Sequence, residues 1–357
     1  MPTSHDEPAC ARRSGPGLGA HPGPATTRSW RLGETPWAGR AHGRSLPRCR
    51  VVIDNDFAGD PDGLVQLAHH ALSPSVDIRV VIGSHAPPAD IERLGTDTAA
   101  DACARVRELF ATMGLNAGDR VVPGADAPLA GRTAPRVSVG ARAIVAEAMR
   151  PDDLPLYVVC GGGLTDLASA YLLEPAIADR LTAVWIGGPE YASPPTSPPP
   201  VTDPEYNLGI DVAAAQVVVT DSAIPLWQVP RDAYMRCVVS DSELQARLLP
   251  HGPLGAHLYR QIEQVHQDRA GHGLPLAETY VLGDSPLVLL TALQGYWVPD
   301  PSSSEFSVRR SPVVDDAGRV GPGSDGRLIR VYDRLDTRLM LEDLYAKLEL
   351  FARWQSG

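Results

Sequence analysis

From residue 50 onwards, segments with the hydrophobic pattern of a strand alternate with segments that have the hydrophobic spacing of a helix. The run from Val51 to Ile53 is short and β-branched, which is typical of a buried strand. Apolar residues then recur at helical spacing, at Leu64, Leu67, Ala68, Ala71 and Leu72. Residues 76–82 form a second β-branched run that ends at a glycine and Ser84. This stretch predicts a strand, a helix and a second strand.

The same order of strand, glycine and helix continues to the end of the chain. Further strands are predicted at 156–159, 183–186, 225–229 and 328–332. Helices are predicted at 101–113, 137–149, 165–173, 241–249, 254–267, 285–293 and 338–351. This order predicts an α/β fold with a mostly parallel central sheet, helices on both faces and a Rossmann-like core. Residues 49–357 are expected to form one domain that binds its ligand at the carboxyl ends of the strands.

The first 48 residues lack any periodic apolar segment. They contain seven prolines, seven glycines and seven arginines against three acidic residues. Such a segment buries too little apolar surface to offset the entropy of ordering it. We therefore expect residues 1–48 to be a disordered extension, and removal of residues 1–46 to leave activity and melting temperature nearly unchanged.

Composition and charge argue against several classes of protein. The formal net charge is −11, and no basic cluster typical of a nucleic-acid binder is present. No apolar run approaches the ~18 residues of a membrane-spanning helix, so we expect no membrane partner. The five cysteines are scattered without a CxxC pair, which favours a reducing cytoplasmic location over a disulfide framework or a zinc site.

The densest group of acidic residues directly follows the first predicted strand. Asp54, Asp56, Asp60 and Asp62 place four carboxylates within nine residues. Carboxylates packed together repel one another unless a cation lies among them or some are protonated. A hard divalent cation such as Ca²⁺ is the simplest resolution. The alternative is an acidic turn in which Asp60 or Asp62 caps the following helix.

A DxD sequence after the first strand is also found in phosphatases that use an aspartate nucleophile and a lysine. Lys347 is the one lysine of the chain and lies in the last predicted helix. Any Schiff-base or phosphatase chemistry would have to use this residue, which makes the phosphatase the weaker hypothesis.

The acidic cluster and four later segments together resemble the inosine–uridine preferring nucleoside hydrolase family. The later segments follow in the family's order and are Gly161–Asp166, Trp185–Gly188, Glu205–Ala215 and Asp284–Leu287. Taken singly, they allow other interpretations: Gly161–Gly163 as a tight turn, Glu205 and Asn207 as loop residues, and Asp284 as a helix start.

The resemblance implies a nucleoside hydrolase-like fold and a Ca²⁺-dependent N-glycosyl hydrolase that converts ribonucleosides to free base and ribose. It implies metal ligands at Asp56, Asp60, Asp62, Asp284 and the carbonyl of Gly161, with the choice between Asp60 and Asp62 left open. It implies substrate contacts from Asp60, Ser84, Glu205, Asn207 and Asp284. The protein is then expected to be a cytoplasmic homodimer or homotetramer whose partner is a small nucleoside.

One position departs from the family's pattern. The family often has a histidine before the aspartate at 284, proposed to protonate the leaving base, and this chain has Gly283. Candidate replacements as acid or stacking group are His266, His272, Tyr280 and Trp227. Water activation is assigned to Asp56 as the base. The rival hypotheses are a catalytically weakened nucleoside- or ribose-binding relative and the DxD phosphatase.

Overall fold

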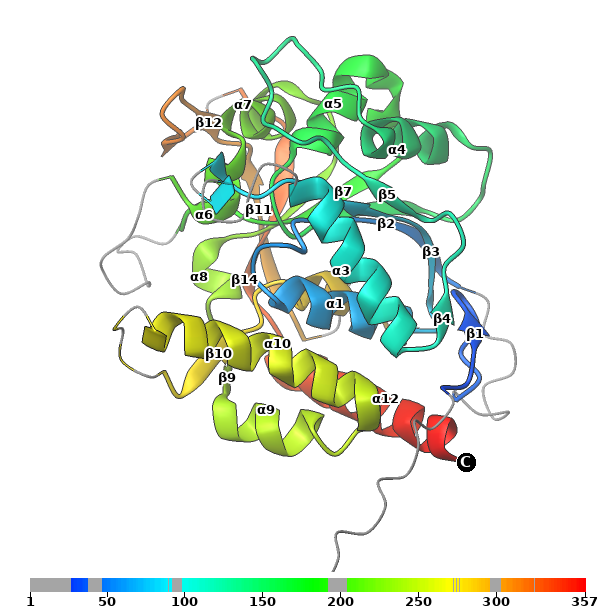
Figure 1. Cartoon of the computed structure of the whole chain (residues 1–357). Coiled ribbons are helices and arrows are strands. Elements are labelled where there is room, and N and C mark those ends of the chain that lie inside the picture. Colours follow the sequence, from blue (N-terminus) through cyan, green and yellow to red (C-terminus); the bar gives the residue numbers. More distant parts are fainter. Residues whose placement is uncertain are drawn as a thin grey trace, which may run out of the picture.

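The centre of the molecule is an eight-stranded sheet (Figure 1). A computed structural model describes residues 27–37, 47–88, 90–91, 98–191, 204–271, 273, 275, 277–295, 303–323 and 325–357. The strands lie in the order β11 (Glu305–Arg310), β14 (Leu328–Arg334), β8 (Leu226–Val229), β7 (Thr182–Ile186), β6 (Leu156–Cys160), β2 (Cys49–Asn55), β3 (Val76–Gly83) and β5 (Val121–Pro123). Neighbouring strands are parallel except for the β11–β14 pair. The sheet is therefore mostly parallel, as predicted.

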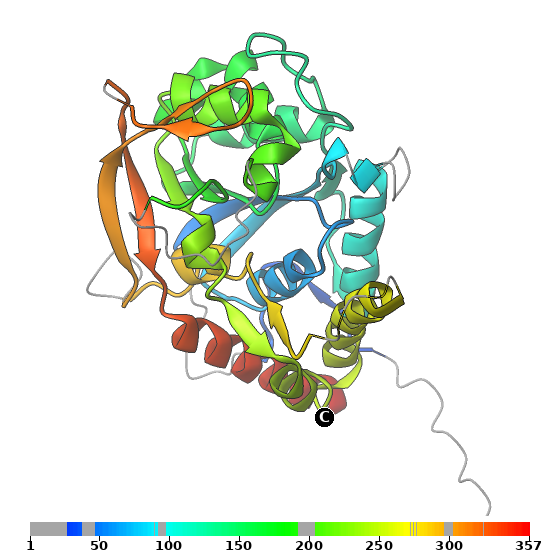
Figure 2. The ribbon, with the colours of Figure 1, turned by 90° about the vertical axis from the view of Figure 1, so that its left-hand side faces the viewer.

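Helices cover both faces of the sheet (Figures 1 and 2). One face packs against α1 (Asp62–Ala71), α3 (Thr98–Thr112), α9 (Asp241–Leu248), α10 (Gly252–Gly271), α11 (Pro286–Thr291) and α12 (Thr337–Ser356). The other packs against α4 (Val139–Met149), α5 (Thr165–Leu173), the 3-10 helix η2 (Pro175–Asp179), α6 (Tyr206–Ile210), α7 (Val212–Ala215) and the π-helix η3 (Gln216–Asp221). Among the described residues, no helix combines the length and apolar character needed to cross a bilayer.

Strand β2 lies in the interior of the sheet and is buried on both faces. Val51 and Ile53 contribute to the core on one side, and Val52 contributes to the core on the other. This two-sided burial explains why the strand reads as a continuous β-branched run. Because β2 pairs with both β3 and β6, its carboxyl end meets the ends of two neighbouring strands.

The predicted helices and strands of the body are all present, and the missed elements are short. Strands β5 and β11 of the central sheet were not expected, nor were three two-stranded sheets. These sheets pair β1 (Trp30–Arg31) with β4 (Leu115–Asn116), β9 (Val238–Ser240) with β10 (Thr279–Val281), and β12 (Val313–Val314) with β13 (Val320–Gly321). Strands of two or three residues are too short to show a period of two.

The prediction of a disordered extension was wrong for residues 27–37. Trp30 and Trp37 are buried and pack edge-to-face, with ring centroids 4.7 Å apart. Both also contact Phe351 of α12. Trp30 Nε1 donates a hydrogen bond of 2.8 Å to the carbonyl of Met113. The buried residues Trp30, Leu32 and Trp37 are enough to anchor this segment, although prolines and glycines surround them. Residues 1–26 and 38–46 lie outside the described residues.

Candidate active site

A cavity of about 180 Å³ lies at the carboxyl ends of the central strands. Six of the residues that line it were predicted from sequence: Asp56, Asp60, Asp62, Gly161, Asn207 and Asp284. The other six were missed: Ile186, Tyr206, Tyr234, Met235, Val281 and Gly283. We refer to this cavity as the acidic pocket.

The floor of the acidic pocket is built by two helix starts and one strand end. Asp62 is the first residue of α1, and Asp284 lies just before α11. The backbone N–H of Asp284 donates to Asp62 Oδ2 at 3.0 Å. Asn55, at the end of β2, donates from Nδ2 to Asp284 Oδ2 at 2.8 Å. Residues more than 220 positions apart in the chain are thus held together by direct hydrogen bonds.

Positions 161 and 162 require glycine because side chains of the pocket floor lie very close to the backbone there. A Cβ atom at Gly161 would lie 2.3 Å from Asn55 Nδ2 and 2.7 Å from Asp284 Oδ2. A Cβ atom at Gly162 would lie 2.9 Å from Asp56 Oδ1. These contacts favour the interpretation of the glycine segment as part of a site over that of a tight turn alone.

Asp56 and Asp284 are buried and Asp62 is half-buried, whereas Asp60 is exposed. Burial raises the pKa of Asp56 and of Asp62 well above the usual range, and the neighbouring carboxylate of Asp284 raises both further. Burial also raises the pKa of Asp284 to about 7, and the hydrogen bond from Asn55 partly opposes the rise. The pocket therefore favours any ligand that brings positive charge to these oxygens.

A second pair of carboxyl groups lies behind the floor. Asp54 is fully buried, and neither of its carboxyl oxygens has a hydrogen-bond partner among the described residues. Burial and the nearby Asp166 raise the pKa of Asp54 well above its ordinary value, and the hydroxyl of Ser84 partly opposes this. Asp166 accepts from the backbone N–H of Ala125 at 3.0 Å. Ser84 thus lies beside Asp54, outside the pocket lining.

Asn207 and Glu205 have different positions, although both were predicted to contact substrate. Asn207 lines the pocket, and its Nδ2 donates to the carbonyls of Gly161 at 3.0 Å and Ile186 at 2.8 Å. Glu205 is outside the lining and only 1% exposed. Its carboxylate caps α6 and accepts four hydrogen bonds, from Gly188 N, Asn207 N, Leu208 N and Tyr234 Oη. In this structure Glu205 supports the pocket wall from behind.

Three of the four residues predicted to act on the leaving group lie outside the lining of the acidic pocket. Trp227 lies near the start of β8, where its ring packs 5.2 Å from that of Tyr157 and carries the guanidinium of Arg330 above it. Its place at the opposite end of the strand from the pocket corrects the stacking prediction. His266 and Tyr280 pack against each other at 6.0 Å, also outside the lining. His272 lies outside the described residues.

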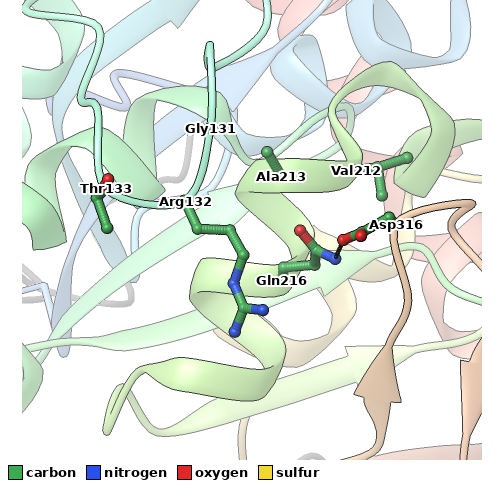
Figure 3. Close-up of a pocket in the computed structure, with 7 residues that line it drawn as sticks. All are labelled: Gly131, Arg132, Thr133, Val212, Ala213, Gln216 and Asp316. Carbon is green, nitrogen blue, oxygen red and sulfur yellow. Dashed lines mark hydrogen bonds between the residues drawn. The ribbon is translucent and has the colours of Figure 1, made fainter.

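A larger cavity of about 400 Å³ lies elsewhere, between α7, η3 and the β12–β13 hairpin (Figure 3). Its polar side chains are already engaged. Arg132 forms an ion pair with Asp221, and Gln216 Nε2 donates to the carboxylate of Asp316 at 2.9 Å. The acidic pocket is the better candidate because its carboxylates gather without a matching number of bases.

The acidic pocket offers oxygen donors suited to a hard cation. They are the carboxylates of Asp56, Asp60, Asp62 and Asp284 and the main-chain carbonyl of Gly161. Over the described residues, no three His, Cys, Asp or Glu side chains are grouped tightly enough to hold a metal ion as they stand. A cation would therefore require these carboxylates to rotate towards one another.

Comparisons with known proteins agree with this arrangement. Residues 51–321 match the family model described as inosine-uridine preferring nucleoside hydrolase. None of the curated proteins compared with the chain matches it.

Solved structures share the fold. They include an inosine-uridine preferring nucleoside hydrolase from Bacillus anthracis, the plant nucleoside hydrolase PpNRh1 and a purine-preferring ribonucleoside hydrolase from Gardnerella vaginalis, with TM-scores of 0.59, 0.60 and 0.61. Each is 16% identical to this chain, over 85% of this chain and 99% of the other. At this identity the likeness establishes the fold.

Proposed function

The chain belongs to the inosine-uridine preferring nucleoside hydrolase family and is a glycosyl hydrolase of that type, and from this premise we propose that the acidic pocket cleaves ribonucleosides to free base and ribose with the help of Ca²⁺. One observation carries the proposal. Asp56 and Asp62 from the first acidic segment meet Asp284 and the carbonyl of Gly161, each from a separate segment, in one pocket. Such a floor suits the polar hydroxyls of a ribose and the charge of a cation.

The chemistry assigned to the pocket is hydrolysis of the C1′–N bond. The bond breaks through an oxocarbenium-like transition state, as in glycosides. A water molecule forms the new C1′–O bond, one of its protons passes to Asp56, and the leaving base takes up a proton from solvent or the pocket. A bound Ca²⁺ would supply positive charge that lowers the pKa of water and offsets the acids. Asp56, Asp60, Asp62, Asp284 and Gly161 are the groups that would hold it.

The remaining polar groups are assigned to the ribose. Asn207 and Asp284 line the pocket and can bond sugar hydroxyls, and Asp60 lies with them in the lining. Holding the sugar in one orientation lowers the entropic part of the barrier. Glu205 contributes by fixing the first turn of α6, which carries Asn207.

The phosphatase hypothesis lacks its lysine. Lys347 lies on α12, where Nζ donates to Ser73 Oγ at 2.8 Å and pairs with Asp343. It is outside the pocket lining. The catalytically weakened binding protein remains the rival, because Gly283 supplies no acid.

A nucleoside panel tests the proposal. Purified protein is incubated with inosine, guanosine, adenosine, uridine and cytidine, with added Ca²⁺ or with chelator, and free base is measured. We expect base release from at least one nucleoside and its loss in chelator. Nucleoside binding by calorimetry without base release would establish the binding protein instead. Undiminished release in chelator would remove Ca²⁺ from the proposal.

We also propose a cytoplasmic homodimer or homotetramer. The support is the absence of a paired-cysteine pattern for the location and the family membership for the assembly. Light scattering coupled to gel filtration measures the subunit number directly.

A further inference from the structure

Tyr234 occupies the space beside the glycine that precedes Asp284. The residue ends α8 (Arg231–Tyr234), which follows β8 at the carboxyl edge of the sheet. A Cβ atom at Gly283 would lie 3.4 Å from Tyr234 Cδ2 and 3.2 Å from Asp62 Oδ2. A methyl group at position 283 would thus touch the ring of Tyr234 at an ordinary contact distance, and a larger side chain would compete with the ring for space.

The hydroxyl of Tyr234 is tied to the support of the pocket. It donates to Glu205 Oε1 at 2.6 Å. Glu205 accepts in turn from the backbone N–H of Asn207, whose side chain reaches the carbonyl of Gly161. One chain of hydrogen bonds thus links the ring of Tyr234 to the floor.

The pocket lining also contains apolar side chains. They are Ile186, Met235 and Val281, and Met235, which follows Tyr234 in the chain, is 47% exposed. The two phenol groups of the lining use their hydrogens within the protein, Tyr234 on Glu205 and Tyr206 on Asp90 at 2.7 Å. This side of the pocket therefore offers packing surface to a ligand, whereas the floor offers carboxylates.

We propose that Tyr234 is a specificity residue that forms the nucleobase-binding wall of the acidic pocket. The ring packs against the flat base, and the hydroxyl holds Asn207 in position through Glu205. Recognition of the base by packing instead of hydrogen bonds predicts that purine and pyrimidine nucleosides are both accepted. This inference rests on the proposed function of the same pocket.

Inhibition by each of the two products tests base binding and ribose binding in the pocket separately. Hypoxanthine and ribose are measured as inhibitors of inosine hydrolysis by wild type, Tyr234→Ala and Tyr234→Phe. Tyr234→Ala should raise the Ki of hypoxanthine roughly ten- to hundredfold, the usual worth of a base–aromatic contact, and leave the Ki of ribose close to wild type. Tyr234→Phe should keep the Ki of hypoxanthine and lower kcat about tenfold, because Glu205 loses a donor.

Tyr345→Phe is the matched control. The hydroxyl of Tyr345 also donates to a half-buried carboxylate, that of Glu243, at 3.1 Å. Tyr345 lies on α12, outside the pocket lining. This variant should lose some stability and keep both inhibition constants. Equal rises of both Ki values in Tyr234→Ala, or no rise in either, would overturn the assignment.

Gly283→Leu sharpens the test. Its cost in kcat/KM should be smaller in the Tyr234→Ala background than in wild type, because the atoms beyond Cβ compete with the ring for space only when the ring is present. Equal costs in both backgrounds would contradict the pairing of the two positions. A wild type that binds hypoxanthine through Tyr234 without cleaving nucleosides would retain this inference and refute the proposed hydrolysis.

Discussion

The two ends of α1 carry buried polar groups with opposite organisation. At the start of the helix, Asp62 faces other carboxylates, chiefly Asp284. At its end, His69 Nε2 lies 2.7 Å from Asp343 Oδ2, and Lys347 pairs with the same carboxylate. Removing one partner of a buried ion pair is costly because it leaves the other charge uncompensated, whereas buried like charges stay unfavourable until a counter-charge binds.

The pKa values follow this division. Burial lowers the pKa of His69 to about 4, so the histidine is neutral beside the Lys347–Asp343 pair. Burial raises the pKa of Asp284 to about 7 at the other end. Substitutions at the two ends should therefore separate activity from stability.

The largest expected effect is that of Asp56→Ala on catalysis. Hydrolysis should fall by roughly 10⁴-fold, because the base is lost. The melting temperature should stay the same or rise, since one of the repelling carboxylates is removed. Steady-state kinetics and calorimetry measure the two quantities. Activity that survives this change would show that another group is the general base.

Lys347→Met should have the reverse profile at the other end of α1. Asp343 would lose its lysine, but its side chain is 26% exposed, so water offsets part of the penalty. We expect the free energy of unfolding to fall by about 2 kcal/mol, measured by urea denaturation, with kcat unchanged. A loss of kcat without a loss of stability would contradict the division between the two ends.

The acidic end predicts a pH dependence of stability without divalent cations. Carboxyl pKa values raised in the folded state mean that the folded protein binds more protons than the unfolded one. Their contribution is fully present below about pH 4 and is lost as pH rises through about 7, the raised pKa of the buried Asp284. Melting temperature in chelator should therefore fall across this window. A flat profile in chelator would contradict the burial of ionisable acids in the pocket.

The smallest effect is expected for Thr291→Val. The hydroxyl of Thr291 lies 2.9 Å from His70 Nε2 and joins α1 to α11. Loss of one buried hydrogen bond should cost about 1 kcal/mol of unfolding free energy. Activity should be unchanged, because the bond lies at the balanced end of α1. A strong effect on KM would show that the two ends communicate.

Local pattern was enough to predict much of the fold and half of the pocket lining. The β-branched run that ends at Ile53 predicted β2, and the rule that ligands lie at carboxyl strand ends predicted where Asp56 would act. Asp62, Gly161 and Asp284 were brought into the same group by resemblance. All of this information is carried by short segments.

The rest of the site depends on contacts between residues far apart in the chain, which no short stretch of sequence indicates. Tyr234 lines the pocket because α8 turns back beside Gly283, and nothing in the residues around Tyr234 indicates this. Trp227 seemed suited to stack on a base, but its position near the start of β8 places it in an aromatic cluster. Lys347 lies in the helix predicted for it, but the sequence does not indicate that its amine donates to Ser73, which is 274 positions away in the chain.

The docking of residues 27–37 on α12 has a consequence for synthesis. Trp30 and Trp37 contact Phe351, more than 300 positions later in the chain. A ribosome makes both tryptophans more than 300 residues before Phe351. The pairing of β1 with β4 and the bond from Trp30 to Met113 use partners made early, whereas the ring contacts with α12 require that helix to have been made. A change in tryptophan fluorescence that depends on Phe351 should therefore appear only after α12 has left the exit tunnel.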